Sequence, residues 1–302
     1  MKMIQVPDGL KRRVLEIADN EKAEAVWCES CYGACDLPPK IPEIDEIIHF
    51  GHNKLVDSEQ KVRYVEMRNH VDEARLREAL NDPKLDKYQK IGLLSSLQFL
   101  DSLKVVKDIL ERRGERKDKR KDKIDGKRNG KKCFIGKSEK LYPGQILGCN
   151  IDAAREVEKL VDCFLFVGSG KFHPLGVALY SEKPVLWLDV EKWKIEEVSR
   201  DRALRAQLAA MALARDARRF GILVSIKPGQ FNIKRALDIL KKIKSEGKEA
   251  YLLIMNEIKP EKIPEGLDCL INTACPRIAI EDRGAFKQSV INSDEFYKIF
   301  SK

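Results

Sequence analysis

Three short stretches of this sequence each carry a cysteine in surroundings that suit metal binding. They are Cys31–Asp36, Leu147–Asn150 and Thr273–Pro276. In each stretch a small residue precedes the last cysteine, and a residue suited to the start of a helix follows it. These following residues are Asp36, Asn150 and Pro276. A thiol at a helix N-terminus lies at the positive end of the helix dipole, which favours the thiolate.

Thiolates are the ligands that iron–sulfur clusters and zinc take from proteins. The sequence therefore predicts that three cysteines share one metal group, provided that the fold brings them together. These cysteines are Cys35, Cys149 and Cys275. A cubane cluster held by three thiolates keeps one iron open for chemistry. For any one of them alone, a small buried residue is the simpler interpretation. The repetition of the pattern favours a shared ligand role.

Apolar strands that alternate with helices must position these cysteines. Predicted strands are Met1–Val6, Ala23–Trp27, Ile44–Phe50, Val62–Met67, Ile91–Leu97, Cys133–Gly136, Cys163–Val167, Pro184–Asp189, Gly221–Ile226, Ala250–Met255 and Asp268–Asn272. Predicted helices are Asp8–Asp19, Asp72–Leu80, Asp101–Arg113, Ile151–Val161, Val198–Phe220, Ile233–Ser245 and Ser293–Phe300. Nearly continuous apolar strands separated by helices indicate parallel sheets that are buried on both faces. We therefore expect an α/β protein.

The spacing of the three cysteines matches a chain of three similar α/β units. Cys35 and Cys149 are 114 residues apart, and Cys149 and Cys275 are 126 residues apart. Each interval is about the size of one small domain. We expect Rossmann-like domains over residues 1–70, 71–190 and 191–302, arranged around a central site.

Polar residues follow several of the predicted strands, where parallel α/β sheets bind ligands. Such residues are His52, Asn53, Ser169, Gly170, His173, Lys227 and Gln230. The glycines around Ser169 let the backbone approach a charged group, although glycine and serine also mark ordinary turns. Arg277 suits a bidentate grip on a carboxylate, and an ordinary surface ion pair explains it equally well.

The other five cysteines could be metal ligands or core residues. Cys28, Cys31 and Cys35 fall within eight residues, which suits a local zinc or cluster loop. Their spacing reverses that of standard radical S-adenosylmethionine enzymes, and no fourth ligand follows at ferredoxin spacing. Cys28 and Cys31 therefore remain a weaker alternative. The other three lie in or beside apolar strands and are predicted to be core residues: Cys133, Cys163 and Cys269.

Composition limits the class of protein. The 302 residues carry a net charge of +9, and the segment Glu111–Lys132 alone accounts for +7 of it. That segment is low in apolar residues and high in charge, which predicts a solvated loop. No aromatic residues interleave its charges, and this argues against a specific single-stranded nucleic-acid site. No apolar run is long enough to cross a membrane, and the N-terminus lacks the features of a signal peptide. We expect a cytoplasmic protein whose cysteines are not disulfide-bonded.

Six motifs, taken together, resemble those of the archaeal diphthamide-synthesis enzymes. They are Tyr32-Gly33-Ala34-Cys35-Asp36, Phe50-Gly51-His52, Tyr142–Asn150, Val167–Gly176, Val224–Gln230 and Ala274–Arg277. The resemblance extends over nearly the whole chain, in the same order. That family consists of S-adenosylmethionine-dependent 3-amino-3-carboxypropyltransferases. The motifs add Gln145 and Ser225 to the candidate cofactor-binding residues given above.

The resemblance implies a complete activity. Three similar α/β domains each give one cysteine, here Cys35, Cys149 and Cys275, to a 4Fe–4S cluster whose unique iron binds S-adenosylmethionine. An electron from the reduced cluster cleaves the bond between sulfur and the methionine γ-carbon. The 3-amino-3-carboxypropyl group is then added to the imidazole carbon of one histidine in translation elongation factor 2, the first step of diphthamide synthesis. A homodimer and an external electron donor are implied as well, and no contact with a membrane or nucleic acid is expected.

Two other function classes stay open. One is another three-domain, three-cysteine cluster enzyme for a small molecule, resembling quinolinate synthase or hydroxymethylbutenyl-diphosphate reductase. The other is a zinc-bound RNA- or ribosome-binding protein that uses the Cys28–Cys35 loop and the basic segment. Colour and iron content after anaerobic purification separate a cluster protein from a zinc protein.

Overall fold

Three separate β-sheets make up the framework of the protein. The computed structural model describes residues 1–112 and 130–300, so most of the basic segment predicted as a loop lies outside the described residues. The chain divides into two compact units, one formed by Met1–Val65 with Asp201–Lys302 and the other by Glu66–Arg200. The first unit contains two sheets and the second contains one. The predicted α/β class with three mainly parallel sheets is confirmed.

The first sheet has the strand order β2-β1-β3-β4, and all its pairs are parallel. Its strands are β1 (Lys2–Gln5), β2 (Ala25–Val26), β3 (Glu46–Phe50) and β4 (Lys61–Val65). Ile4 and Ile48 pack with helix α1 (Val14–Glu21) on one face, whereas Met3 and Ile47 pack on the other. Burial on both faces explains why these strands read as continuous apolar runs.

The second sheet has the order β6-β5-β7-β8-β9. Its strands are β5 (Lys90–Ser95), β6 (Lys132–Phe134), β7 (Cys163–Gly168), β8 (Val185–Asp189) and β9 (Lys194–Glu197), of which only β9 runs antiparallel to its neighbour. Its helices are α2 (Glu73–Ala79), α3 (Ser102–Arg112), α4 (Asp152–Val157) and α5 (Phe172–Tyr180). Central strand β7 is buried along its whole length, which anchors the loop that follows it.

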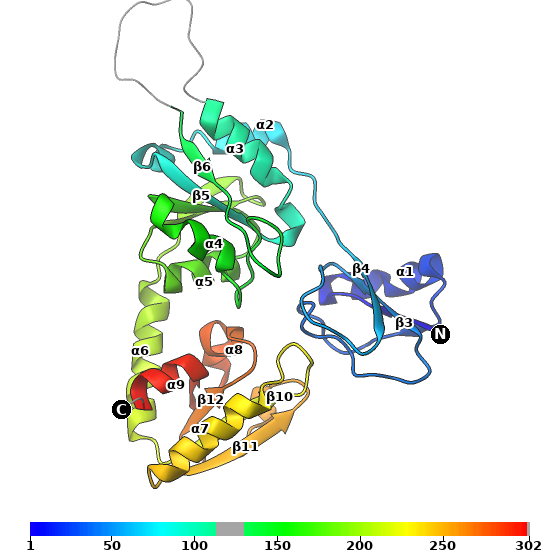
Figure 1. Cartoon of the computed structure of the whole chain (residues 1–302), viewed down its shortest axis with the longest axis vertical. Coiled ribbons are helices and arrows are strands. Elements are labelled where there is room, and N and C mark those ends of the chain that lie inside the picture. The colour runs from blue at the N-terminus through cyan, green and yellow to red at the C-terminus, as the bar shows by residue number, and fades with distance from the viewer. Residues whose placement is uncertain (113–129, 301–302) are drawn as a thin grey trace, which may run out of the picture. The chain divides into compact units, whose positions relative to one another are not determined.

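The third sheet has the order β11-β10-β12-β13, and all its pairs are parallel. Its strands are β10 (Arg219–Ser225), β11 (Glu249–Met255), β12 (Cys269–Asn272) and β13 (Ser289–Asn292). The helices are α6 (Asp201–Asp216), α7 (Ile233–Ser245), α8 (Arg277–Ile280) and α9 (Ser293–Phe300). Figure 1 shows α7 lying along β10 and β11. Its buried residues Ala236, Ile239 and Ile243 form the helical stripe that packs there.

Short 3-10 helices connect these elements. They are Asp8–Arg13, Pro83–Lys87, Leu97–Phe99, Glu158–Leu160, Pro260–Lys262 and Asp282–Ala285. Within residues 1–112 and 130–300, every helix is too short or too polar to span a bilayer.

The structure corrects several predicted helix boundaries. The helix predicted over Asp8–Asp19 is a 3-10 turn followed by α1, because Arg13 has the non-helical dihedrals φ −111° and ψ 7°. The helix predicted over Val198–Phe220 is α6 alone. Val198 hydrogen-bonds to Val185 beside strand β8, and Phe220 is fully buried in β10. Tertiary pairing at both ends overrides the helix propensity of these segments.

Strands β9 and β13 and helix α5 are among the elements that the sequence pattern does not predict. Strands β9 and β13 are short edge strands of four residues each. Helix α5 begins inside the glycine-rich segment that was predicted to be a loop, so His173 lies on a helix. Pro174 at the third residue of α5 is compatible with its first turn, where no intrahelical N–H bond is needed.

Candidate metal centre

The cysteine loop of the first sheet is held by its neighbouring aspartate. Cys35 is partly exposed in a turn closed by a 3.0 Å hydrogen bond from the Asp36 amide to the Gly33 carbonyl. No helix follows Asp36 in this described region, so its predicted capping role is wrong. Its carboxylate instead accepts the Tyr32 amide at 2.7 Å and is fully buried. The helix-dipole argument therefore does not apply to Cys35.

The loop after β10 closes on this turn within the same unit. The Gln230 side-chain amide donates to Asp36 Oδ1 at 2.6 Å and lies 3.6 Å from Cys35 Sγ. The Lys227 ammonium is 3.3 Å from the same Asp36 oxygen, and both side chains are almost wholly buried. The structure thus brings Lys227 and Gln230, both predicted site residues, to Cys35.

Gly229 makes this close approach possible. Its amide donates to the Cys35 carbonyl at 3.1 Å. A Cβ atom at position 229 would lie 2.5 Å from both Cα and Cβ of Cys35. Only glycine allows the two backbones to meet at this distance. Ser225, at the end of β10, supports the same loop, because its hydroxyl donates to the Asn256 carbonyl at 2.9 Å and accepts the Lys227 amide at 3.3 Å.

The third cysteine loop lies in the same unit. Cys275 is partly exposed between β12 and α8, and the side chain of buried Asn272 donates to its carbonyl at 2.8 Å. Arg277 pairs with Glu281 at 2.9 Å, and its guanidinium lies 5.9 Å from the centre of the Tyr32 ring. Lys227 lies 5.6 Å from the same ring. Tyr32 therefore joins the Cys35 loop to the loops that carry Lys227 and Cys275.

The remaining predicted ligand belongs to the other unit. Cys149 is exposed in a tight turn in which Leu147 and Asn150 exchange backbone hydrogen bonds of 2.8 and 3.2 Å. The Asn150 side chain accepts the Asp152 amide at 3.0 Å, at the start of α4. The N-cap residue of the six-residue helix α4 is Ile151, so the predicted capping position of Asn150 is wrong by one residue.

Other predicted residues of this second unit lie on three different segments. Gln145 is fully buried, and its side-chain oxygen accepts the Tyr142 amide at 3.1 Å. Ser169 and Gly170 form the turn after β7, where Gly170 has a φ of 77° that favours glycine. The His173 ring stacks on Phe166, with ring centres 5.9 Å apart.

A chain of hydrogen-bonded side chains runs behind the Cys35 loop. The Gln5 side chain donates to the Asp36 carbonyl at 2.7 Å, and its oxygen is 2.7 Å from Nδ1 of His49. Nε2 of His49 is 2.9 Å from Nδ1 of His52. Burial lowers the pKa of His49 to about 3 and also lowers the pKa of His52. Both rings are therefore neutral near pH 7.

Only one of these histidines was found from the sequence. His52 was predicted, and Asn53 beside it is partly buried in the loop after β3. Gln5 and His49 were missed, although both are buried polar residues within strands. A lone polar residue inside an otherwise apolar strand was the available signal, since such a group needs a partner when it is buried.

Accessibility separates the eight cysteines, all of which are free thiols. The three predicted core cysteines are buried, and burial raises the pKa of each thiol to about 12: Cys133, Cys163 and Cys269. Their predicted core role is confirmed. Cys35, Cys149 and Cys275 are partly or fully exposed, as ligands of an added group must be. Cys28 is exposed and Cys31 is buried, so these two differ from each other.

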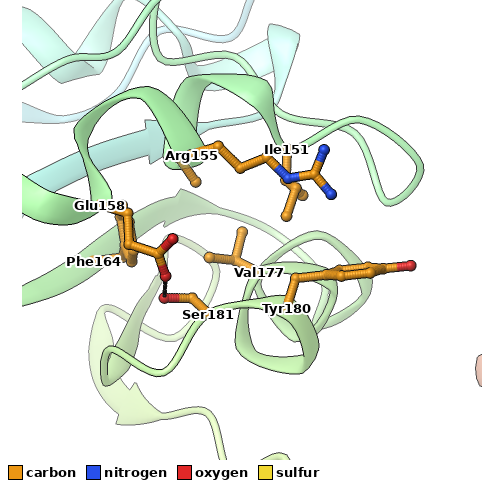
Figure 2. A pocket seen from close by; sticks show the side chains of 8 residues that line it. Ile151, Arg155, Glu158, Phe164, Val177, Tyr180 and Ser181 are labelled. Atoms are coloured by element: carbon orange, nitrogen blue, oxygen red, sulfur yellow. Dashed lines mark hydrogen bonds between the residues drawn. The ribbon is translucent and has the colours of Figure 1, made fainter.

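A small pocket in the second unit is lined by none of the predicted site residues. Figure 2 shows its lining by residues of α4 and α5 and their neighbours, with Glu158 accepting the Ser181 hydroxyl at 2.6 Å. Arg155 lies 5.7 Å from the centre of the Tyr180 ring. The cavity volume is about 80 Å³, well below the roughly 300–1,000 Å³ of sites for drug-sized ligands. It is too small for a nucleoside cofactor.

Comparison with known proteins gives consistent matches over the whole chain. A family model for diphthamide synthesis proteins matches residues 6–302. The 2-(3-amino-3-carboxypropyl)histidine synthase of Pyrococcus horikoshii is 33% identical over 97% of this chain and 83% of that protein. The enzyme of the same name from Methanocaldococcus jannaschii is 28% identical over 99% of this chain and 84% of that protein.

Solved structures agree with the sequence matches. The crystal structure of Dph2 from Pyrococcus horikoshii with a 4Fe–4S cluster has a TM-score of 0.84 and 30% sequence identity to this chain. The match covers 99% of this chain and 86% of that one. A second crystal structure of the same protein matches with a TM-score of 0.83.

Proposed function

The chain belongs to the diphthamide synthesis family, and from this we propose that it is a 2-(3-amino-3-carboxypropyl)histidine synthase. It transfers the 3-amino-3-carboxypropyl group of S-adenosylmethionine to the imidazole carbon of a histidine in translation elongation factor 2. This is the first step of diphthamide synthesis. The comparisons do not favour the small-molecule cluster enzyme or the RNA-binding protein considered above.

One observation supports the cluster most directly. Three free cysteines, each in a loop beside a different sheet, remain accessible while three others are buried in the cores. This donor set fits a 4Fe–4S cluster with one iron left open, and we propose Cys35, Cys149 and Cys275 as its ligands. When bound, the cluster supplies the electron that cleaves the bond between the sulfur and the γ-carbon of S-adenosylmethionine.

The protein's own groups hold this site in place. Gly229 lets the loop after β10 meet the Cys35 backbone, and Gln230 directs its amide N–H groups at Asp36 and Cys35 Sγ. An amide donor near a ligating sulfur draws electron density from it, which raises the reduction potential of a bound cluster. Lys227 neutralises the buried Asp36 carboxylate, so the loop carries little net charge there.

We propose that S-adenosylmethionine is bound by polar groups that follow the strand ends. The candidates are Asn53, Gln145, Ser169, Gly170, His173, Ser225, Lys227, Gln230 and Arg277. His52 is the remaining candidate, and its Nδ1 lies 2.9 Å from Nε2 of His49. Arg277 is a candidate for the methionine carboxylate, since it lies two residues after Cys275 and presents a guanidinium.

The proposed partners are elongation factor 2 as the protein substrate, an external electron donor and a second copy of this chain. We also propose that the protein acts in the cytoplasm, where its protein substrate is found. The three sheets are proposed to mark three similar domains, over residues 1–70, 71–190 and 191–302.

Single-turnover chemistry tests the proposed function. The reconstituted enzyme is reduced with dithionite under anaerobic conditions and mixed with S-adenosylmethionine and elongation factor 2. We expect mass spectrometry to detect methylthioadenosine and elongation factor 2 carrying the group on one histidine. The matched control is elongation factor 2 with that histidine replaced. Absence of both products with a fully loaded, reduced enzyme would refute the proposed function.

A further inference from the structure

A second group of metal-ligating side chains lies close to Cys35, and none of its members is a proposed cluster ligand. Ligand atoms of Cys31, His49 and His52 all lie within 4.8 Å of one another. Cys31 and His49 are buried, and His52 is partly buried. We propose that these three residues form a separate site for one divalent transition-metal ion of the zinc class.

The site is oriented by buried partners. The Gln5 side chain is fully buried, and its N–H donates to the Asp36 carbonyl, so its oxygen must be the atom that faces Nδ1 of His49. Nδ1 of His49 therefore carries the proton, and Nε2 presents a lone pair. Metal-ligating histidines in proteins almost always donate their other N–H to such an oxygen. His49 is thus already in the tautomer, and makes the supporting hydrogen bond, that a metal-binding histidine needs.

The distances suit metal binding after a small adjustment. In a tetrahedral zinc site with two nitrogens and one sulfur, ligand atoms are roughly 3.3–3.6 Å apart. Nε2 of His49 and Nδ1 of His52 are 2.9 Å apart and share one proton in a hydrogen bond. On binding, that proton moves to Nε2 of His52, and the two lone pairs then face the ion. The Cys31 thiol loses its proton to solvent and becomes a thiolate ligand.

The ligand types select the kind of ion. Two imidazoles and one thiolate are borderline-soft donors that suit zinc and cobalt(II), and they are poor ligands for magnesium or calcium. The site gives three protein ligands, so a water molecule or another group completes four-coordination.

Cys31 is distinguished from the proposed cluster ligands by its surroundings. Its sulfur lies 3.8 Å from the Gly33 carbonyl and is only 2% exposed at the residue level, whereas Cys35 Sγ lies 3.6 Å from the Gln230 amide. The two thiols of this loop therefore have different neighbours. An ordinary buried cysteine beside a hydrogen-bonded histidine pair is the competing explanation, and metal binding is the property that separates the two.

Cobalt(II) titration of the full chain tests the proposal. In a Cys35→Ala/Cys149→Ala/Cys275→Ala variant, which lacks the proposed cluster thiols, we expect one equivalent of Co²⁺ to bind with a thiolate-to-cobalt absorption band. Zn²⁺ should displace it and raise the thermal unfolding midpoint. Adding Cys31→Ala should abolish the band, and adding Gln5→Ala should weaken binding by about 10–100-fold. Adding Cys28→Ala, an exposed thiol of the same loop, should change neither.

A second measurement keeps the test valid if the triple variant does not fold. In the otherwise unaltered chain with a reconstituted cluster, elemental analysis after Zn²⁺ loading and desalting should find one zinc per chain besides the iron. Cys31→Ala should remove the zinc and leave the iron unchanged. Loss of iron instead would mean that Cys31 is a cluster ligand, and zinc content that survives Cys31→Ala and His49→Gln would equally overturn the proposal.

Discussion

The cysteine side chains of this protein differ in the groups that surround their sulfur atoms. Cys35 is accompanied by an amide donor from Gln230, whereas Cys133 and Cys163 lie in the hydrophobic core of the second sheet. A thiol in such a core is held in the protonated form, because burial disfavours its anion. The reactivity of each cysteine thiol in this chain therefore depends on the local surroundings of its sulfur atom.

The first prediction concerns the proposed cluster ligands. Cys35→Ala, Cys149→Ala and Cys275→Ala should each lower iron content and visible absorption after anaerobic reconstitution to near background, because three thiolates are needed to hold the cluster. Cys28→Ala is the matched control and should keep about four irons per chain. Full iron loading after any of the three changes would contradict the ligand assignment.

A second prediction concerns Glu295, whose carboxylate accepts the Gln207 side chain at 2.6 Å and the Asn292 amide at 3.0 Å. Burial raises the pKa of Glu295 above its usual value of 4.5. Above pH 4.5 the folded chain therefore binds this proton more readily than the unfolded chain, and lowering the pH through that window favours folding. The unfolding free energy of the native chain, compared with Glu295→Gln, should rise between pH 7 and pH 5.

Urea titrations at several pH values provide the measurement. Comparison with the Glu295→Gln variant removes the contribution of all other titrating groups. If the difference in unfolding free energy between the two proteins stays constant from pH 7 to pH 5, the pKa of Glu295 is not raised by folding.

At the scale of elements, the meeting of two loops organises the first unit. The turn around Cys35 and the loop after β10 share a backbone hydrogen bond, a side-chain hydrogen bond and a buried ion pair. These contacts join two loops that are connected to different sheets. Each loop therefore depends on the other for its conformation.

The third prediction tests the backbone approach. Gly229→Ala places a methyl group 2.5 Å from Cα of Cys35, which forces the loops apart and should cost about 1–3 kcal/mol of stability. Iron loading should fall in parallel. Gly9→Ala is the control in the same unit, because nothing lies within 4 Å of its added Cβ. Equal melting temperatures for the two variants would show that the Gly229 and Cys35 backbones are not in close contact.

The fourth prediction tests the buried ion pair. Asp36→Asn leaves the Lys227 ammonium buried without its counter-charge and should cost about 3–5 kcal/mol in chemical denaturation. The double variant Asp36→Asn/Lys227→Met removes both charges and should recover most of that loss. If the single change alters the unfolding free energy by less than about 1 kcal/mol, the pair is not desolvated in solution.

The sequence predicted the strands better than the helix ends, for a physical reason. Helix α7 and helix α9 have the predicted bounds, because an apolar stripe or a capping sequence specifies them locally. The ends of α6 were wrong because Val198 and Phe220 are fixed by strand partners far away in sequence. Edge strands β9 and β13 carry little apolar pattern of their own, so pairing alone defines them.

The same distinction applies to the site. The cysteine loops could be predicted because each motif is contiguous. The ion pair between Asp36 and Lys227 could not, since 191 residues separate the two and nothing local indicates their contact. The role expected for Asp36 was a helix cap, which its sequence neighbours alone suggest.

For the molecule as a whole, the second unit is an insertion within the first. The chain leaves the first unit after Val65 and returns to it at Asp201. One proposed ligand, Cys149, comes from the inserted unit, and the other two, Cys35 and Cys275, come from the two parts of the first. The donor set is therefore complete only when both units have folded.

The fifth prediction concerns the proposed homodimer. Light scattering should give the mass of two chains at micromolar concentration. Edge strand β11 exposes Tyr251 and Ile254, which are 49% and 56% exposed, and apolar edges of this kind favour association. Ile254→Lys should shift the mass toward one chain, whereas Leu15→Lys, at an exposed position of α1, should not. A single-chain mass for the unaltered protein would contradict a homodimer.

The interrupted first unit also sets an order of events during synthesis. Ribosomes add about 5–20 residues per second, so the Cys35 loop emerges roughly 10–40 s before Lys227 reaches Asp36. During that interval Cys35 lacks its contacts with Gly229 and Gln230. A nascent chain is then most vulnerable to oxidation and to capture of the wrong metal. If Cys35 and Cys275 are both cluster ligands, as proposed, the cluster cannot be complete until the loop of Cys275 has also been synthesised, 240 residues after Cys35.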